Sequence, residues 1–122
     1  MPISPLLVAV AASFVCLNPT HYDGDNMRCR NVEGSLRLYG IDAPEMPGAC
    51  RRGRRCVAGN PYASRDHLRR LTRGRAVRCQ VRDVDDYGRR VVDCTADGRN
   101  IGCAMIRAGH AVPRYGRLRC AG

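Results

Sequence analysis

The chain has 122 residues, enough for one domain with a buried core and too few for two. Its net charge of +10 favours a polyanionic partner and argues against an acidic one. All 21 basic residues are arginines, whose planar guanidinium group pairs two phosphate oxygens at once, although a genome-wide compositional bias would give the same count.

The chain opens with an apolar segment, residues 5–12, that is too short to span a bilayer. The segment is similar to the hydrophobic part of a secretion signal and offers small residues at Ala9-Val10-Ala11, but it lacks a basic leader. We expect residues 1–12 to be the remnant of a signal peptide and residues 13–122 to form the domain. The protein would then be secreted or periplasmic.

Three strands are expected in the first part of the domain, over residues 13–20, 26–31 and 35–41. An Asp-Gly-Asp turn at residues 23–25 joins the first two, because Asp and Gly tolerate the geometry of a tight reversal. A loop rich in Gly, Pro and Arg follows over residues 43–60. Asn60 and Pro61 then predict the start of a helix that ends near Gly74, since Asn caps helices and Pro fits their first turn.

A hairpin is predicted after this helix. Val77 and Cys79 alternate with polar residues, which is the period-two pattern of a half-buried strand. Val92 and Cys94 continue the inward-facing set after a turn at residues 85–88. We therefore expect two strands whose apolar side chains face the core.

A second helix is predicted over residues 101–108, closed by Gly109. Three strands, a helix and two strands are the element order of the OB-fold, a small barrel that commonly binds oligonucleotides. The order alone leaves other α+β folds open.

Three short motifs carry the acids and arginines of a candidate site. They are Asp23-Gly24-Asp25, Arg37-Leu38-Tyr39-Gly40-Ile41-Asp42-Ala43-Pro44-Glu45 and Asp86-Tyr87-Gly88-Arg89. Each motif alone is weak, but their order and spacing resemble the staphylococcal nuclease (thermonuclease) family over residues 16–115. The resemblance implies an α+β, mainly β fold: a five-stranded OB-fold barrel with one helix between strands 3 and 4 and another after strand 5.

By this resemblance, Asp25 and Asp42 are calcium ligands, joined by the backbone carbonyl of Ala43. Oxygen-only ligands suit calcium, which accepts flexible geometry. The family usually has Thr at position 43, and because the main chain supplies the ligand we expect Ala to be tolerated. Asp23 either orients a metal-bound water or simply forms the turn.

The resemblance assigns catalysis to Arg37, Glu45 and Arg89. Glu45, one of two glutamates in the chain, is the expected general base that activates water, and the alternative is an exposed loop glutamate. The two arginines are expected to clamp the phosphoryl oxygens as the transition state forms.

Tyr87 and Tyr115 match positions that contact the nucleotide in the family, by stacking or by a phenolic hydrogen bond to phosphate. An aromatic platform tolerates any base, so weak sequence preference is expected. Position 86 is Asp where the best-known member has lysine near a terminal phosphate, and Arg90 would compensate. The arginine run at residues 51–55 either tracks a nucleic-acid backbone or is a solvated surface.

Eight cysteines in so short a chain indicate a disulfide framework and an oxidising compartment. Neighbours in the inferred fold favour one of many possible sets of pairs: Cys16 with Cys29, Cys50 with Cys56, Cys79 with Cys94, and Cys103 with Cys120. The sequence does not fix this connectivity, and Cys79 and Cys94 would otherwise be buried thiols. Zinc is the rival interpretation, although no Cys-x-x-Cys pair occurs and the three histidines are scattered.

The sequence thus predicts a calcium-dependent nuclease that hydrolyses DNA and RNA with little sequence selectivity. It would act as a monomer on single-stranded or fraying nucleic acid, with no membrane role, and the resemblance implies products with 3′-phosphates. An alternative is a catalytically silent OB-type module that binds nucleic acid or protein, but silent copies lose the arginines or the glutamate and this chain keeps both. A third candidate, a cationic effector of anionic membranes, needs a strongly amphipathic helix, and neither predicted helix offers a wide apolar face.

Overall fold

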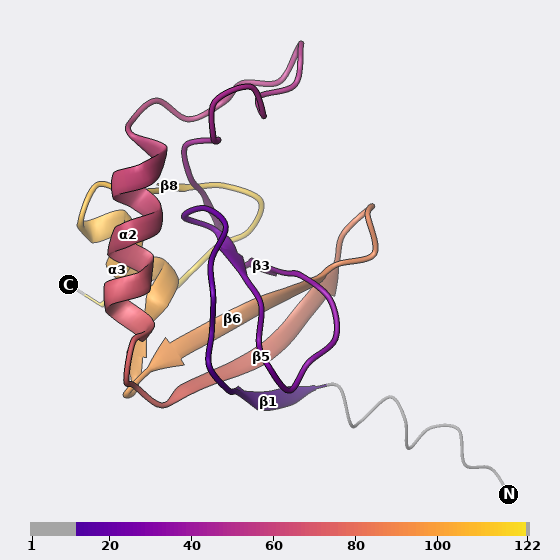
Figure 1. Ribbon diagram of the computed structural model, residues 1–122, viewed down its shortest axis with the longest axis vertical. Coiled ribbons are helices and arrows are strands. Elements are labelled where there is room, and N and C mark those ends of the chain that lie inside the picture. Colours follow the sequence, from indigo (N-terminus) through magenta and orange to yellow (C-terminus); the bar gives the residue numbers. More distant parts are fainter. Residues whose placement is uncertain (1–11, 122) are drawn as a thin grey trace, which may run out of the picture.

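The centre of the fold is a long antiparallel hairpin, β5 (Val77–Val84) and β6 (Arg90–Ala96), in a computed structural model that describes residues 12–121 (Figure 1). Strand β1 (Ser13–Cys16) pairs with the free edge of β5. The three strands form a curved surface, and two helices lie side by side near one end of it (Figure 1). The hairpin is therefore the frame to which the other elements attach.

The alternation predicted for the hairpin is confirmed. Val77 and Cys79 are buried on β5, and Val92 and Cys94 are buried on β6. Cys79 and Cys94 face each other directly across the strand pair. The hairpin thus presents one apolar face to the core.

The other edge of β6 carries the remaining strands of this sheet. Strand β3 (Leu36–Leu38) lies parallel to β6, and β2 (Asn26–Met27) pairs antiparallel with β3. The short strand β7 (Arg99–Asn100) also pairs with β6. The path β1-β5-β6-β3-β2, with β7 beside β6, makes a six-stranded sheet.

A separate two-stranded sheet joins β4 (Ile41–Asp42) to β8 (Val112–Pro113). The described residues therefore contain eight strands, and the predicted count of five was wrong. The strand predicted over residues 35–41 is divided into β3 and β4, because Gly40 turns the backbone with a φ of +78°. Strands β7 and β8 are two residues long, too short to show a periodic pattern.

The two ends of the sheet path lie close together. Beyond β1, Thr20 exchanges two backbone hydrogen bonds of 2.9 Å with Arg28, which follows β2. A disulfide between Cys16 and Cys29 adds a covalent link at the same place. The strands predicted over residues 13–20 and 26–31 are therefore shorter than expected, and they meet at an isolated bridge beyond β1 and β2 and not in a regular strand pair.

Both predicted helices are present, α2 (Pro61–Thr72) and α3 (Ile101–Arg107). The Asn60 side chain caps α2: its Oδ1 accepts from the Tyr62 N–H at 2.9 Å and from the Ala63 N–H at 3.1 Å. Asn100 caps α3 in the same way, accepting from the Cys103 N–H at 2.9 Å. Local capping chemistry thus fixes where each helix begins.

The core lies between the curved sheet and the helices. Its largest fully buried apolar side chains come from five strands and both helices: Met27, Leu36, Leu38, Ile41, Leu68, Val77, Val92, Ile101 and Met105.

Four disulfides join the pairs favoured from the sequence: Cys16–Cys29, Cys50–Cys56, Cys79–Cys94 and Cys103–Cys120. Within the described chain no cysteine keeps a free thiol. None is therefore left as a ligand for zinc, and that interpretation is wrong.

The segment expected to be a signal-peptide remnant, residues 1–12, falls outside the described residues apart from Ala12. Of the helices in the described part of the chain, none has the length and apolar character that crossing a membrane requires.

One buried polar side chain, His21, ties the first turn of the domain to α2. Its Nδ1 lies 2.7 Å from the Asn26 carbonyl oxygen and its Nε2 lies 2.9 Å from the Thr72 hydroxyl. Because a carbonyl only accepts, Nδ1 carries the proton and Nε2 is the acceptor of a neutral imidazole. Burial lowers the pKa of His21, the bond to Asn26 opposes this, and Arg69 adds to it.

We predict that the contribution of His21 to the free energy of unfolding falls as the pH is lowered from about 7.5 to about 5.5. In this window the unfolded imidazole takes up a proton that the folded His21 resists, so acid favours the unfolded chain. Urea denaturation of His21→Gln should show a weaker pH dependence than the native chain. His67, whose pKa is lowered by burial and by His110, contributes equally to both proteins. An unchanged pH dependence in the variant would contradict the prediction.

Candidate active site

A cleft of about 620 Å³ opens beside the β5–β6 turn and the loop that follows β4. It is lined by most of the residues predicted from the motifs: Asp23, Asp25, Arg37, Glu45, Tyr87, Arg89 and Tyr115. Asp42 and Ala43 are buried and do not line it, and neither does Arg90. Segments far apart in the sequence thus meet at one concave surface.

The Asp-Gly-Asp turn is held in place by a close approach to α2. A Cβ atom on Gly24 would lie 1.9 Å from Ser64 Oγ and 2.9 Å from the Ala43 side chain, so only glycine fits. The Asp25 carbonyl accepts from the Leu38 N–H at 2.9 Å, which joins the turn to β3. These contacts put the Asp25 carboxylate against the main chain of Ala43, whose N–H donates to Oδ2 at 2.9 Å.

Asp25 is a buried carboxylate with incomplete charge compensation. Its Oδ2 lies 3.3 Å from Arg37 Nη1. Burial raises the pKa of Asp25 well above its usual range, Arg37 opposes this, and the nearby Asp23 adds to it. A carboxyl group in this state gains from further positive charge close by.

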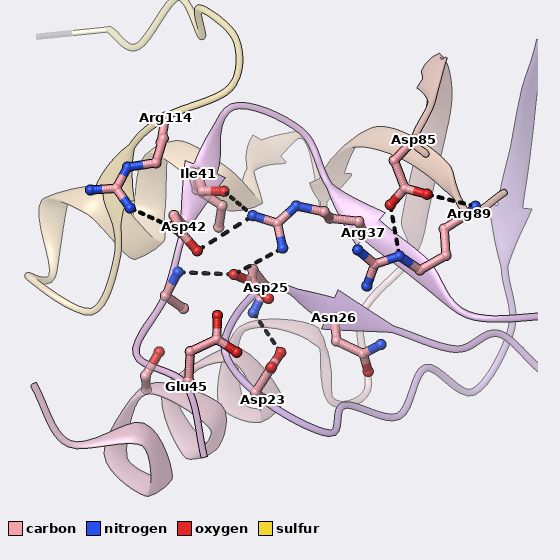
Figure 2. Close-up of polar contacts among 12 residues, drawn as sticks. Asp23, Asp25, Asn26, Arg37, Ile41, Asp42, Glu45, Asp85, Arg89 and Arg114 are labelled. Atoms are coloured by element: carbon pink, nitrogen blue, oxygen red, sulfur yellow. Dashed lines mark hydrogen bonds and ion pairs between the residues drawn. The ribbon is translucent and has the colours of Figure 1, made fainter. Parts of the chain in front are cut away.

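Asp42, at the end of β4, is completely buried and is surrounded by guanidinium groups. Its Oδ1 lies 3.4 Å from Arg37 Nη2 and 3.1 Å from Arg54 Nη2. Its Oδ2 lies 3.2 Å from the same Arg54 nitrogen and 2.7 Å from Arg114 Nη1. Arg37 therefore bridges Asp25 and Asp42, as Figure 2 shows, and it also donates to the Ile41 carbonyl at 3.2 Å.

Glu45 is half-buried at the start of the long loop and forms an ion pair with Arg54. The same guanidinium thus contacts Asp42 and Glu45 together. Partial burial works against the charge of Arg54, but Tyr115, Asp42 and Glu45 outweigh it and raise its pKa. Arg54 is therefore a permanent cation between the two acids.

Arg89 is positioned by Asp85, on the turn between β5 and β6 (Figure 2). The Arg89 Nε donates to Asp85 Oδ2 at 2.7 Å and its backbone N–H donates to Oδ1 at 2.9 Å. Burial disfavours the charged form of Asp85, but the hydrogen bonds from Arg89 and Tyr87 prevail and lower its pKa. The turn therefore presents Arg89 to the cleft as a fixed cation.

The two predicted tyrosines are exposed, Tyr87 at 66% and Tyr115 at 61% of their surface. The Arg37 guanidinium lies 5.4 Å from the Tyr115 ring centre, and the Arg51 and Arg89 guanidiniums lie 5.1 and 5.6 Å from that of Tyr87. Both rings are thus largely exposed, and each has two guanidinium groups near it, a combination found where proteins bind a base and its phosphate.

The family model of the staphylococcal nuclease homologues matches residues 35–119. The chain belongs to this family. The comparison with curated proteins gave no match. Members of the staphylococcal nuclease family are in general calcium-dependent nucleases or nucleic-acid-binding domains. The match includes Arg37, Glu45 and Arg89 but begins after the Asp-Gly-Asp turn. Asp25 is placed in the site by its contact with the Ala43 main chain.

Three residues of this site were not predicted: Arg54, Asp85 and Arg114. Arg54 lay within the arginine run and Asp85 within a predicted turn, but neither position indicated its partner. Among 21 arginines, charge alone does not single out two.

The donor set of this staphylococcal nuclease homologue fits a hard cation in its chemistry. Asp25 and Asp42 bring two carboxylates to the Ala43 main chain, and such oxygen donors suit calcium. Burial holds the pKa of Asp25 well above its usual range. Among residues 12–121 no cluster of three acidic, His or Cys side chains is suited to a metal. The chain alone therefore offers few ligands, and the remainder would be water, main-chain carbonyl and phosphate oxygens.

We predict that Asp42→Asn lowers the free energy of unfolding in chelator by about 3–5 kcal/mol, because three guanidinium groups would then lack their shared counter-ion. Asp66→Asn is the matched control, since Asp66 forms ion pairs that are nearly half exposed, and it should cost less than about 1 kcal/mol. Urea denaturation measures both. Equal losses in the two variants would contradict a structural role for the Asp42 cluster.

Proposed function

We propose that this protein is a calcium-dependent nuclease that hydrolyses phosphodiester bonds of DNA and RNA with little sequence selectivity. The observation that carries the proposal is the Arg37 bridge between Asp25 and Asp42 in a cleft that also holds Glu45 and Arg89. Membership of the nuclease family supports it independently.

In the proposed reaction, the scissile phosphate enters the cleft between Arg37 and Arg89. Glu45 takes a proton from water, and the water oxygen attacks phosphorus. The two guanidinium groups stabilise the charge that grows on the phosphoryl oxygens. Calcium, held by Asp25, Asp42 and the Ala43 carbonyl, would supply further positive charge at the phosphate. The bond from phosphorus to the 5′ oxygen then breaks, this oxygen takes a proton from solvent, and Glu45 returns its proton to solvent. The family resemblance implies that the products carry 3′-phosphates.

The exposed rings of Tyr87 and Tyr115 support binding of unpaired bases, and stacking on a ring is tolerant of base identity. A single-stranded or fraying substrate is therefore proposed. The net charge of +10 supports long-range attraction of the strand, with a strong dependence on salt.

We further propose that the sheet closes into an OB-fold barrel, which the backbone bonds between Thr20 and Arg28 support. The four disulfides support a secreted or periplasmic protein, since such bonds persist in oxidising compartments. A monomer is proposed, with Arg90 assisting at a terminal phosphate.

We predict that Glu45→Gln lowers kcat for cleavage of single-stranded DNA by about 10²–10⁴-fold, because water loses its base. Arg89→Ala should lower kcat by about 10²–10³-fold, because a transition-state contact is lost. Both losses are measured with the oxidised protein in calcium, and chelator should abolish cleavage by the native chain.

Arg78→Ala is the matched control, because Arg78 is exposed on β5 and does not line the cleft. It removes the same charge and should leave kcat within about threefold of native. Undiminished digestion by the Glu45→Gln, Arg89→Ala double variant would rule out the assignment. Binding of DNA without cleavage in calcium or magnesium would indicate a silent binding module instead.

We also predict how pH acts on calcium binding. Calcium binds the ionised carboxylate, so below the raised pKa of Asp25 binding has to release a proton. The rise in Tm on adding calcium should be full at about pH 8 and should shrink as the pH falls, starting above the ordinary aspartate range. Without calcium, Asp25 stabilises the folded state more in acid than at neutral pH, because its pKa is raised by folding. This contribution is lost as the pH rises through the pKa of the folded state.

Thermal denaturation with and without calcium over this pH range measures the effect. Asp23→Asn removes a charge that raises the pKa of Asp25, so the onset should move to lower pH. A calcium effect that persists down to about pH 4 would contradict the prediction.

A further inference from the structure

The carboxylate of Asp42 has no acceptor position left for another cation. A carboxylate offers about four lone-pair sites on its two oxygens. Here Arg37 and Arg54 occupy Oδ1 at 3.4 and 3.1 Å, and Arg54 and Arg114 occupy Oδ2 at 3.2 and 2.7 Å. A divalent ion reaches this carboxylate only if a guanidinium group moves away.

Of the three arginines, Arg54 is the one placed to leave. Its side chain is 30% exposed, against 13% for Arg37 and 23% for Arg114. It makes two of the four contacts to Asp42 and also pairs with Glu45, so one movement opens an acceptor position on each Asp42 oxygen and releases Glu45. Arg37, in contrast, is fixed on β3 and is needed by Asp25.

Arg54 is held by a short loop that the Cys50–Cys56 disulfide closes. The loop makes two more hydrogen bonds to other parts of the fold. Arg51 Nη1 donates to the Tyr87 hydroxyl, in the β5–β6 turn, at 2.6 Å. The Arg55 carbonyl accepts from Arg114 Nη1 at 2.8 Å.

We propose that Arg54 is a built-in counter-ion of Asp42 and Glu45, which a divalent cation has to displace before the site becomes active. The loop closed by Cys50 and Cys56, here called the strap, holds Arg54 against the two acids. This inference rests on the proposed calcium site and concerns what competes for it. Because a stacked base also competes with Arg51 for Tyr87, an incoming strand loosens the same strap.

The test is calorimetric titration of calcium into the oxidised, full-length chain without nucleic acid. Arg54→Ala should bind calcium about tenfold more tightly than the native chain, because the ion no longer displaces a bound guanidinium. Arg54→Met keeps most of the side-chain stem and should show the same gain. Cys50→Ser with Cys56→Ser loosens the strap and should shift the affinity in the same direction by less.

Arg52→Ala is the matched control. Arg52 is exposed in the same loop, so its loss removes one positive charge without touching Asp42 or Glu45. Its calcium affinity should change by less than about twofold, because salt screens exposed charges. Thermal melts in chelator establish that each variant is folded.

Arg54 variants that match Arg52→Ala in calcium affinity, or bind calcium more weakly, would overturn the inference. So would an absence of calcium binding in every variant. The nuclease proposal is judged separately by cleavage with the native chain. Tighter calcium binding by the Arg54 variants, without cleavage by the native chain, would support the counter-ion role of Arg54 and refute the nuclease proposal. Cleavage by the native chain, with calcium affinity unchanged in the Arg54 variants, would support the nuclease proposal and refute the counter-ion role.

Discussion

The guanidinium group of Arg37 is the interaction on which the cleft depends. It contacts two buried carboxylates and the Ile41 carbonyl, and so links the turn before β2, the strand β3 and the strand β4. Strands β2 and β4 contain two residues each, and short ladders alone would hold them weakly. Burying the Asp25 and Asp42 carboxylates would be strongly destabilising without a cation between them. The Arg37 guanidinium, whose charge suits phosphate binding, therefore also holds these elements together.

Much of the fold could be predicted because local rules decide it. Asn60 with Pro61 and the segment ending at Gly109 follow capping chemistry, and the alternation from Val77 follows from one buried face. Strand β8 could not be predicted, since its two residues pair with β4 only because the chain returns there. The break at Gly40 was equally hidden, because the sequence shows a glycine but not the direction in which the backbone turns.

The candidate site shows the same division. Motif residues from three segments, including Asp25, Glu45 and Arg89, line one cleft as the family resemblance implied. The residues that hold them were not foreseen, since the partner of Arg54 or Arg114 is defined by distance in space and not by spacing along the chain. Asp42 lies behind the cleft wall, where its charge acts through the arginines around it.

The disulfide between Cys103 and Cys120 ties the last part of the described chain to α3. This tail carries Tyr115, which lines the cleft, and Arg114, which pairs with the buried Asp42. It is one of four disulfide-closed loops, and the longest joins cysteines 17 residues apart. Each ring removes conformations from the denatured chain. After heating and cooling, an oxidised molecule therefore keeps this tail within reach of α3, whereas a reduced one has to bring the two together from an open coil.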